Sequence, residues 1–298
     1  MATKRSAVGA QVPWKEVGVD GVRLAYDDEG SGPTLVCLHA IGHGASDFVG
    51  LRARLRGGWR VLALDWPGQG NSGDDHVPVS VVRYGDLLGG FLDAVGIEQA
   101  VLLGNSIGGA AAVRLAAAQP ARVRALVLAN PGGLDRVDAL TGPVTRLMAR
   151  SFTAGAHGAR WYPRAFAAYY RLVLSRPMAA SQRQRIVASA TEVAAVLAQA
   201  WRSFGTPDND VRGLAPRITC PVLFAWATGD RINQLRRCRP ACQQFPNARL
   251  ERFRGGHAAF LEDPDAFLTA LNRFLSTLRF AESGTAQAVA CRPVEVSA

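Results

Sequence analysis

The stretch AVLLGNSIGGAAAVRLAAAQ, residues 100–119, decides the fold. An apolar run that reads as a buried strand leads into the pattern G-x-S-x-G at 104–108, and an alanine-rich segment with helical character follows. Small residues on both sides of Ser106 allow a sharp strand-to-helix turn, and the start of the helix directs free N–H groups toward a developing oxyanion. This context favours Ser106 as a nucleophile over the alternative, a glycine-rich turn that merely contains a serine.

The same alternation of strand and helix extends along the chain on both sides of this unit. Before it, the residues around Asp20-Gly21 alternate apolar and polar, as in a tight hairpin. Short apolar runs typical of strands buried on both faces occupy 34–40, 59–65, 123–130 and 221–228, and helical stretches occupy 46–57, 81–96 and 107–119. The pattern predicts an α/β protein with a mostly parallel, doubly wound sheet.

The alternation is interrupted between two strand runs, where residues 134–215 read as helices at 144–152, 163–175 and 181–204. We interpret this segment as an inserted helical cap and residues 1–133 and 216–280 as one discontinuous core. The cap holds eleven arginines against five acidic residues, a net charge of +6. Residues 281–298 lack periodicity and are predicted to form a flexible tail.

Composition limits the possible partners. The 298 residues are 48% hydrophobic, which supports a large core, and the net charge is +10. Only Lys4 and Lys15 are lysine, and the arginines are dispersed with no helix-turn-helix, RNP-like or finger signature, so we expect no nucleic-acid partner. Five cysteines without a CxxC pair predict neither a disulfide framework nor a zinc site, and no apolar run is long enough for a membrane span. A cytoplasmic protein without metal fits best.

Two further residues complete a catalytic set with Ser106. His39 and His43 precede the serine, and His76 and His157 lie in a polar loop and in the cap. His257 remains, between the last strand run and the last helix. The imidazole needs an acid, and Asp230 follows the strand 221–228, at the edge where open α/β sheets place their sites. Asp135, after the preceding strand, is the less favoured alternative.

Five segments together resemble the α/β-hydrolase family with a helical cap, over about residues 14–278. They are LHAIGHG (38–44), DWPGQGNSG (65–73), GNSIGG (104–109), ATGDRIN (227–233) and GGHAAFLEDPDAF (255–267). The resemblance implies an oxyanion hole formed by the backbone N–H groups of Ile41 and Ile107. It also implies that the glycines of 65–73 form turns rather than bind phosphate, and no cofactor is expected.

A serine in the nucleophile position predicts acyl-transfer hydrolysis of a small carbonyl substrate, a carboxylic ester, thioester or lactone. GNSIGG is also similar to the nucleophile turn of the meta-cleavage product hydrolases, which cleave C–C bonds in keto-dienoic acids, although HAIGHGAS and Ala258 depart from their pattern. A non-catalytic ligand receptor on the same fold is the alternative from another class.

Candidates for substrate contact are Arg164 and Arg171 of the cap, Trp66 and Phe260. An inward-facing arginine would select a carboxylate-bearing substrate. The sequence predicts neither the oligomeric state nor the natural substrate.

Overall fold

The structure is a computed structural model that describes residues 14–138 and 141–278. Its centre is one eight-stranded sheet in the order β1-β2-β4-β3-β5-β6-β7-β8. The strands are β1 (Lys15–Val19), β2 (Val22–Glu29), β3 (Thr34–Leu38), β4 (Arg60–Leu64), β5 (Ala100–Asn105), β6 (Val123–Ala129), β7 (Val222–Ala227) and β8 (Ala248–Phe253). From β4 to β8 all neighbours are parallel, whereas β1 and β2 pair antiparallel and join β4 antiparallel. The predicted α/β architecture is confirmed.

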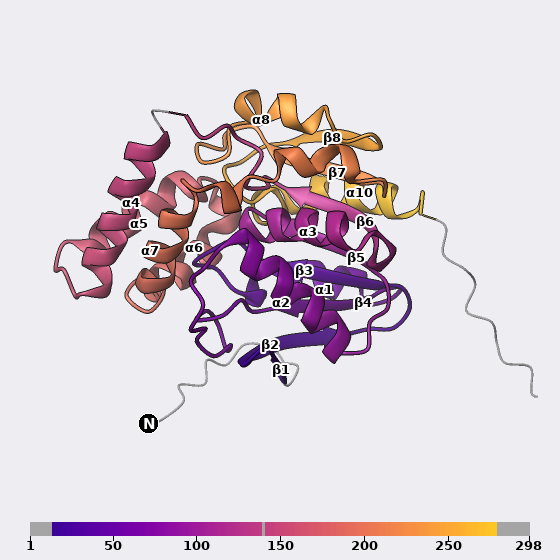
Figure 1. Cartoon of the computed structure of the whole chain (residues 1–298), viewed down its shortest axis with the longest axis horizontal. Helices are drawn as coiled ribbons and strands as arrows, with labels where there is room; N and C mark the ends of the chain where they lie inside the picture. The colour runs from indigo at the N-terminus through magenta and orange to yellow at the C-terminus, as the bar shows by residue number, and fades with distance from the viewer. Residues whose placement is uncertain (1–13, 139–140, 279–298) are drawn as a thin grey trace, which may run out of the picture.

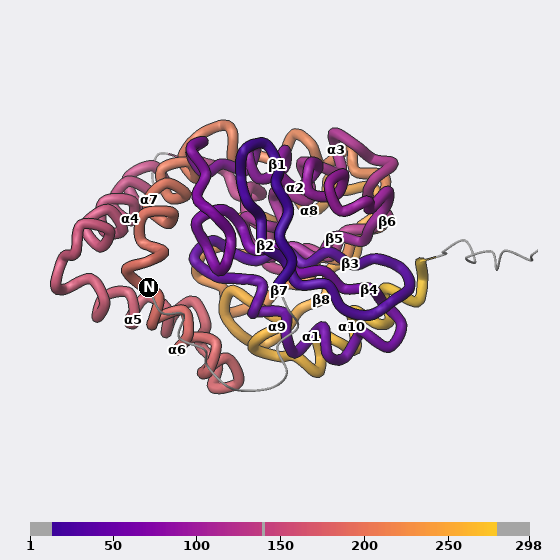
Figure 2. Tube along the Cα trace, turned by 90° about the horizontal axis from the view of Figure 1, so that it is seen from below, coloured from indigo at the N-terminus to yellow at the C-terminus, as the bar shows by residue number. Residues whose placement is uncertain are grey.

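Helices cover both faces of the sheet. They are α1 (Val49–Leu55), α2 (Val81–Ala94), α3 (Ile107–Ala118), α8 (Leu235–Cys242), α9 (Ala259–Glu262) and α10 (Pro264–Leu275). Figure 2 shows α2, α3 and α8 on one face and α1, α9 and α10 on the other. Every residue of β5 and β7 is therefore buried, which explains why these strands are continuous apolar runs.

The predicted hairpin is present at the start of the described chain. Lys15 pairs with Tyr26 and Val19 with Val22, so the turn consists of Asp20 and Gly21. Their φ angles are 45° and 79°. Both lie in the left-handed region that a two-residue turn of this kind requires, which accounts for the Asp-Gly pair.

Four α-helices of the described residues lie between β6 and β7 and extend beside the sheet, on the left in Figure 1. They are α4 (Thr141–Ala156), α5 (Tyr162–Val173), α6 (Ala180–Ala188) and α7 (Ala194–Ser203), and we call them the inserted helices. Phe152 packs at their centre, with its ring 6.2 Å from those of both Tyr162 and Trp201. The stretch 181–204 is two helices rather than one, because residues 189–193 form a turn. None of the helices in the described ranges is long and apolar enough to cross a bilayer.

The register brings several loops to one edge of the sheet. Leu38 of β3 lies beside Gly104 of β5, and Asn105 of β5 lies beside Ala129 of β6. The loops that follow these three strands therefore leave the sheet together. The predicted tail, residues 281–298, lies outside the described residues.

Candidate active site

Ser106 lies in the turn between β5 and α3, with φ of 54° and ψ of −119°. A positive φ in a residue other than glycine costs about 1–3 kcal/mol and persists only where the surroundings enforce it. Here the Ser106 amide donates to the Ala129 carbonyl (3.2 Å), and its carbonyl accepts from the amides of Gly132 (2.9 Å) and Ala110 (3.1 Å). The hydroxyl caps none of the described amides of α3, so it is left for other chemistry.

Close backbone contacts explain the glycines around this serine. A methyl group on Gly104 would lie 2.5 Å from the carbonyl oxygen of Gly108, and one on Gly108 would lie 2.5 Å from the carbonyl oxygen of Leu38. Separations this short are not tolerated, so only glycine lets α3 start directly against the ends of β5 and β3. The spacing G-x-S-x-G is thus a packing requirement.

The two amides implied for the oxyanion hole come from the two segments that meet where Gly108 packs on the Leu38 carbonyl. Ile107 is the first residue of α3, and Ile41 follows β3 in a loop that Gln69 fastens by accepting from the Gly42 amide (2.6 Å). Among the described residues, neither the Ile41 nor the Ile107 amide donates a hydrogen bond to a protein acceptor. An oxyanion hole needs N–H groups without such acceptors; Ile107 also lines the cavity beside Ser106, whereas Ile41 is not among its lining residues.

His257 and Asp230, which the sequence suggested as partners, are in contact. His257 Nδ1 lies 2.8 Å from Asp230 Oδ2, and both side chains are buried. An ionised carboxylate can only accept, so His257 carries its proton on Nδ1 and presents Nε2 as a base. The arrangement fixes the tautomer that proton abstraction from a serine needs.

Asp230 is held by donors that the sequence analysis did not identify. The Asn130 side-chain amide donates to Oδ2 (2.7 Å), and the backbone amides of Ile232 (2.7 Å) and Asn233 (3.1 Å) donate to Oδ1. Asn130 is fully buried with φ of 46° and also accepts from the Ala227 amide (3.1 Å), so it ties the end of β6 to the end of β7. The sequence offered one signal for the role of Asn130: an asparagine stands directly after strand β6, at a position where glycine would be usual.

The loop that carries His257 is fastened from two directions. On the sheet side, the Asn105 side-chain amide donates to the His257 carbonyl (2.9 Å) and to the Ala129 carbonyl (2.8 Å). On the other side, the His257 amide donates to the carbonyl of Val173, the last residue of α5 (2.7 Å). The inserted helices therefore take part in positioning this loop.

Glu262 forms a second link between the two layers. Its carboxylate accepts from the amide of Gly256, beside His257, at 2.6 Å. Its other oxygen accepts from the Arg176 amide (2.9 Å) and the Ser175 hydroxyl (3.2 Å), in the segment after α5. Glu262 is almost completely buried, so these donors replace its hydration.

Ser106 and His257 are brought to the same sheet edge. No hydrogen bond joins the Ser106 hydroxyl to His257 in the described part of the chain. Such contacts are often long without substrate and shorten in the Michaelis complex. The link between the two residues is instead Asn105, which precedes the serine and holds the histidine loop.

A second buried histidine–aspartate pair lies under the inserted helices. His43 Nδ1 is 2.6 Å from Asp47 Oδ2, and the Asp47 carboxylate also accepts from Gln182 of α6. The His43 ring lies 5.6 Å from that of Tyr170. His43 lines a different cavity from the one that Ser106 lines. This pair joins the loop after β3 to the inserted helices.

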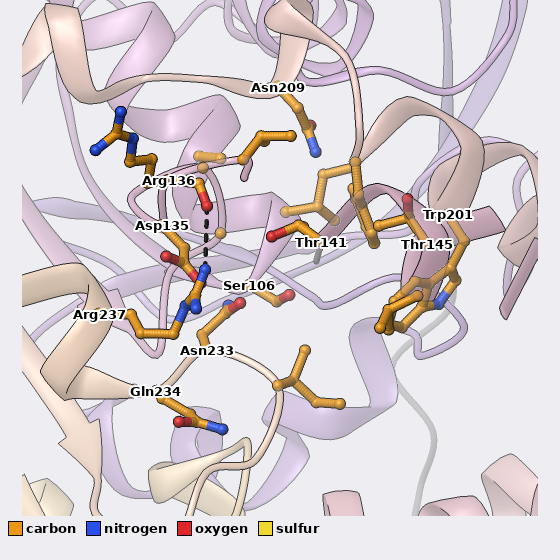
Figure 3. Close-up of a pocket in the computed structure, with 18 of the residues that line it drawn as sticks. Ser106, Asp135, Arg136, Thr141, Thr145, Trp201, Asn209, Asn233, Gln234 and Arg237 are labelled. Carbon is orange, nitrogen blue, oxygen red and sulfur yellow. Dashed lines mark hydrogen bonds and ion pairs between the residues drawn. The ribbon is translucent and has the colours of Figure 1, made fainter. Parts of the chain in front are cut away.

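Ser106 lines a cavity of about 430 Å³ between the sheet edge and the inserted helices (Figure 3). Tyr169 of α5 forms part of the cavity wall. The pKa of its phenol is raised, mainly by burial and secondly by the negative charge of Asp230. The phenol therefore stays neutral at ordinary pH. A volume of this size suits a small organic substrate.

Several candidates from the sequence lie outside this cavity. Arg164 and Arg171 are exposed and are not among the residues that line it. Trp66 is fully buried in the core, stacked on Tyr84 at 4.4 Å, and Phe260 stacks on Phe48 at 4.9 Å. The structure brings none of these four predicted side chains to Ser106. The two arginines of helix α5 point to solvent, and the rings of Trp66 and Phe260 are packed in the hydrophobic core.

Asp135, the alternative acid, does line the cavity, but it is engaged elsewhere. Its carboxylate accepts from Arg237 Nε at 2.6 Å, and Arg237 also reaches Asp138 at 2.9 Å. Figure 3 shows Arg237 beside Asp135. Asp135 forms no hydrogen bond to His257 in the described ranges. Of the two carboxylates considered, the structure joins Asp230 to the histidine.

Two buried titratable side chains next to the site have shifted pKa values. His39 Nδ1 donates to the Ala40 carbonyl (2.7 Å), and its Nε2 accepts from the Trp66 amide (2.9 Å). Burial lowers the pKa of His39 to about 4, so it is neutral and has no free base nitrogen. Burial also raises the pKa of Asp65 to about 6, against the opposing effect of the donating amides of Ala45 and Asn71. Both residues shape loops rather than face substrate.

Comparisons with known proteins place this geometry in context. The family model of the alpha/beta hydrolase fold matches residues 33–264. An uncharacterized protein of Mycobacterium tuberculosis is 27% identical over 89% of this chain and 81% of that protein. A 2-hydroxy-6-oxononadienedioate/2-hydroxy-6-oxononatrienedioate hydrolase of Paraburkholderia phymatum is 42% identical over 37% of this chain and 41% of that protein. A thermophilic esterase from Thermogutta terrifontis has the same fold, with a TM-score of 0.77 at 20% identity over 90% of this chain and all of that one.

Proposed function

This chain belongs to the α/β-hydrolase family, and on that premise we propose that it is a serine hydrolase of small carboxylic esters, thioesters or lactones. Ser106 is the nucleophile, His257 the general base and Asp230 the residue that orients it. The hydrogen bond of 2.8 Å between His257 and Asp230, on a loop fastened to the neighbour of Ser106, carries the proposal.

The reaction proceeds in two halves. His257 Nε2 takes the Ser106 hydroxyl proton as Oγ attacks the substrate carbonyl, and the amides of Ile41 and Ile107 stabilise the oxyanion. The tetrahedral intermediate then loses the alkoxide or thiolate, which takes the proton from the imidazolium and becomes an alcohol or thiol, and an acyl-enzyme remains; from a lactone the new hydroxyl stays attached to the acyl chain. His257 then activates water, and the second tetrahedral intermediate collapses to the acid and free Ser106.

We further propose that residues 134–215 act as a cap over this site. Helices α4 and α7 supply Met148 and Trp201 to the cavity wall, and α5 supplies Tyr169. The hydrogen bond from His257 to Val173 supports the same assignment. Differences in these helices would then decide which substrates fit.

Hydrolysis of a C–C bond next to a carbonyl is a second candidate. Its support is the 42% identity over 120 residues to the hydrolase of Paraburkholderia phymatum named above. The serine, base and oxyanion amides would take equivalent roles. A dienoate chromophore consumed faster than simple esters would favour this reaction.

The test is a series of p-nitrophenyl esters from acetate to octanoate, assayed at neutral pH with the wild type and with Ser106→Ala. We expect turnover by the wild type and a loss of about 10⁴-fold or more in the variant, with the fold retained. Equal turnover by both proteins would refute the proposal. No turnover of any ester, together with no labelling by a serine-reactive phosphonate, would favour a ligand receptor.

A further inference from the structure

A second hollow, which we call the basic hollow, lies on the inserted helices. Its volume is about 540 Å³, and it is formed by α4 and α7, which lie side by side in Figures 1 and 2. Apart from two alanines, it is lined by three arginines, one histidine and one threonine, namely Arg146, Arg150, Arg202, His157 and Thr153. None of these residues lines the cavity beside Ser106, so the basic hollow is a separate space.

Helical spacing gathers most of these side chains on one face. Arg146, Arg150, Thr153 and His157 follow one another at intervals of four, three and four residues, which places them in one row along α4 and the turn that ends it. A different face of α4, which includes Met148, lines the cavity of the candidate active site. The helix therefore presents one side to that cavity and another to the basic hollow.

Two of the polar side chains are already held in place by hydrogen bonds. Arg202 of α7 donates from a guanidinium nitrogen to the Thr153 hydroxyl (2.7 Å), which in turn donates to the Ala149 carbonyl (2.8 Å). His157 Nδ1 donates to the Thr153 carbonyl (2.8 Å), so its Nε2 is left for another partner. Side chains that are fixed before a ligand arrives lose less conformational entropy when it binds.

The charge of the basic hollow is not compensated by the protein. No carboxylate is among its described lining residues, and none of its three arginines forms an ion pair within residues 14–138 and 141–278. The cavity beside Ser106 differs in this respect, because the Arg237 guanidinium there pairs with Asp135 at 2.6 Å and with Asp138 at 2.9 Å. Positive charges gathered in one hollow repel each other, and a bound anion would relieve this repulsion.

The number and kind of donors indicate which anion fits. The planar N–H pair of one guanidinium matches the two oxygens of one carboxylate, so a single arginine is enough for that group. Three guanidinium groups match an anion with more oxygens and more charge, and a phosphate monoester has three free oxygens and a charge of about −1.5 to −2 at neutral pH. The volume is in the range of small-molecule sites, about 300–1,000 Å³, which leaves room for an organic part.

We propose that the basic hollow is a binding site for the phosphate group of a phosphate monoester or diphosphate. Arg146, Arg150 and Arg202 donate to the phosphate oxygens. The site lies apart from Ser106, and the inference does not depend on the proposed function. A phosphate monoester belongs either to a soluble molecule or to the head group of a lipid, and both present the same group to the three arginines.

The first test is calorimetric titration of the full chain with inorganic pyrophosphate and with phenyl phosphate, at neutral pH and low salt. We expect binding at one site, weakened by about tenfold or more in the double variant Arg146→Gln/Arg150→Gln. The matched control is Arg164→Gln/Arg171→Gln, which removes the same charge from α5 at positions outside the basic hollow and should change the affinity by less than about twofold. All four arginines are exposed, so both variants should fold.

A second test separates the two sources of phosphate. Vesicles of phosphatidylcholine with about 20% phosphatidic acid are sedimented with each protein. Sedimentation that is lost in Arg146→Gln/Arg150→Gln and retained in the control would identify a lipid head group. Binding of the soluble phosphates without sedimentation would identify a soluble phosphate ester.

Three results would overturn the inference. The first is the absence of saturable binding to the soluble phosphates and to the vesicles. The second is equal weakening in the two double variants, which would assign the binding to the overall charge of the protein. The third is binding of malonate, a dicarboxylate, as tightly as phenyl phosphate, because the site would then not select phosphate. Each of these results would leave the proposed function intact.

Discussion

The two halves of the candidate site are built in different ways. The Ser106 turn is held by backbone packed against backbone, with Gly108 placed directly on the end of β3. The His257 loop is held by side chains and by carbonyls from distant segments, among them Asn105 and Val173. The first half needs small residues around the serine and only backbone atoms from the strands that surround it, and the second depends on particular side chains and on contacts between layers. We therefore expect the turn to fail through misfolding and the loop to fail through misplacement of the base.

The largest effect should come from separating the base from its acid. Asp230→Asn keeps the shape but favours the wrong tautomer of His257, and we expect kcat for ester hydrolysis to fall by about 10⁴-fold. Asp135→Asn and His43→Gln should each lose less than about tenfold. If Asp230→Asn stayed active and Asp135→Asn lost activity, Asp135 would be the acid. If Asp230→Asn stayed active and His43→Gln lost activity, His43 would be the base.

A substitution in the turn should act on stability. Gly108→Ala forces a methyl group against the Leu38 carbonyl, and we expect the free energy of unfolding in urea to fall by about 3 kcal/mol. Gly50→Ala is the matched control, because a methyl group there meets nothing within 4 Å and alanine suits a helix. Equal stability of the two variants would show that the close packing is not required.

The burial of His39 beside the Ser106 turn predicts that the stability of the protein depends on pH. Burial lowers the pKa of His39 to about 4 in the folded protein, whereas its ordinary pKa, which applies to the unfolded chain, is 6.5. As the pH falls, His39 therefore takes up its proton in the unfolded chain before it does so in the folded protein. This residue therefore lowers wild-type stability between pH 6.5 and pH 4, by up to about 3 kcal/mol. In His39→Gln this contribution is missing.

The measurement is the difference in urea unfolding free energy between wild type and His39→Gln. This difference should shrink as the pH falls from 6.5 to about 4. Asp65, with its pKa raised to about 6, makes the wild type gain stability as pH falls toward 4, but it is present in both proteins and cancels. Parallel stability curves for the two proteins would contradict the prediction.

The smallest effect should come from loosening the histidine loop. Glu262→Gln replaces an acceptor with a donor that faces the amide of Gly256 or Arg176. We expect kcat to fall by about tenfold with KM nearly unchanged, because the base is displaced while the cavity remains. Glu251→Gln, in β8 with a half-buried side chain that pairs with Arg273, is the control and should behave as wild type. A change confined to KM would assign Glu262 a role in the cavity instead.

Much of the fold could be predicted because its signals are local. Continuous apolar runs identified the strands, Asp20-Gly21 identified the hairpin, and Gly104 and Gly108 marked the turn at Ser106. The choice of His257 and Asp230 as partners followed from their positions after strands, and the structure places the two side chains in contact. Asn105 and Asn130 were missed because a hydrogen bond across more than twenty residues leaves no periodic pattern.

The sequence by itself determined the parallel α/β core and the strained turn at Ser106, since both follow from spacing and from residues too small to be replaced. Only the tertiary structure decided which side chains face the cavity. It sent Arg164 and Arg171 to solvent, packed Trp66 into the core and turned the Asn209 amide inward. The orientation of a helix on its neighbours is set by packing between segments distant in sequence, and short-range patterns do not encode it.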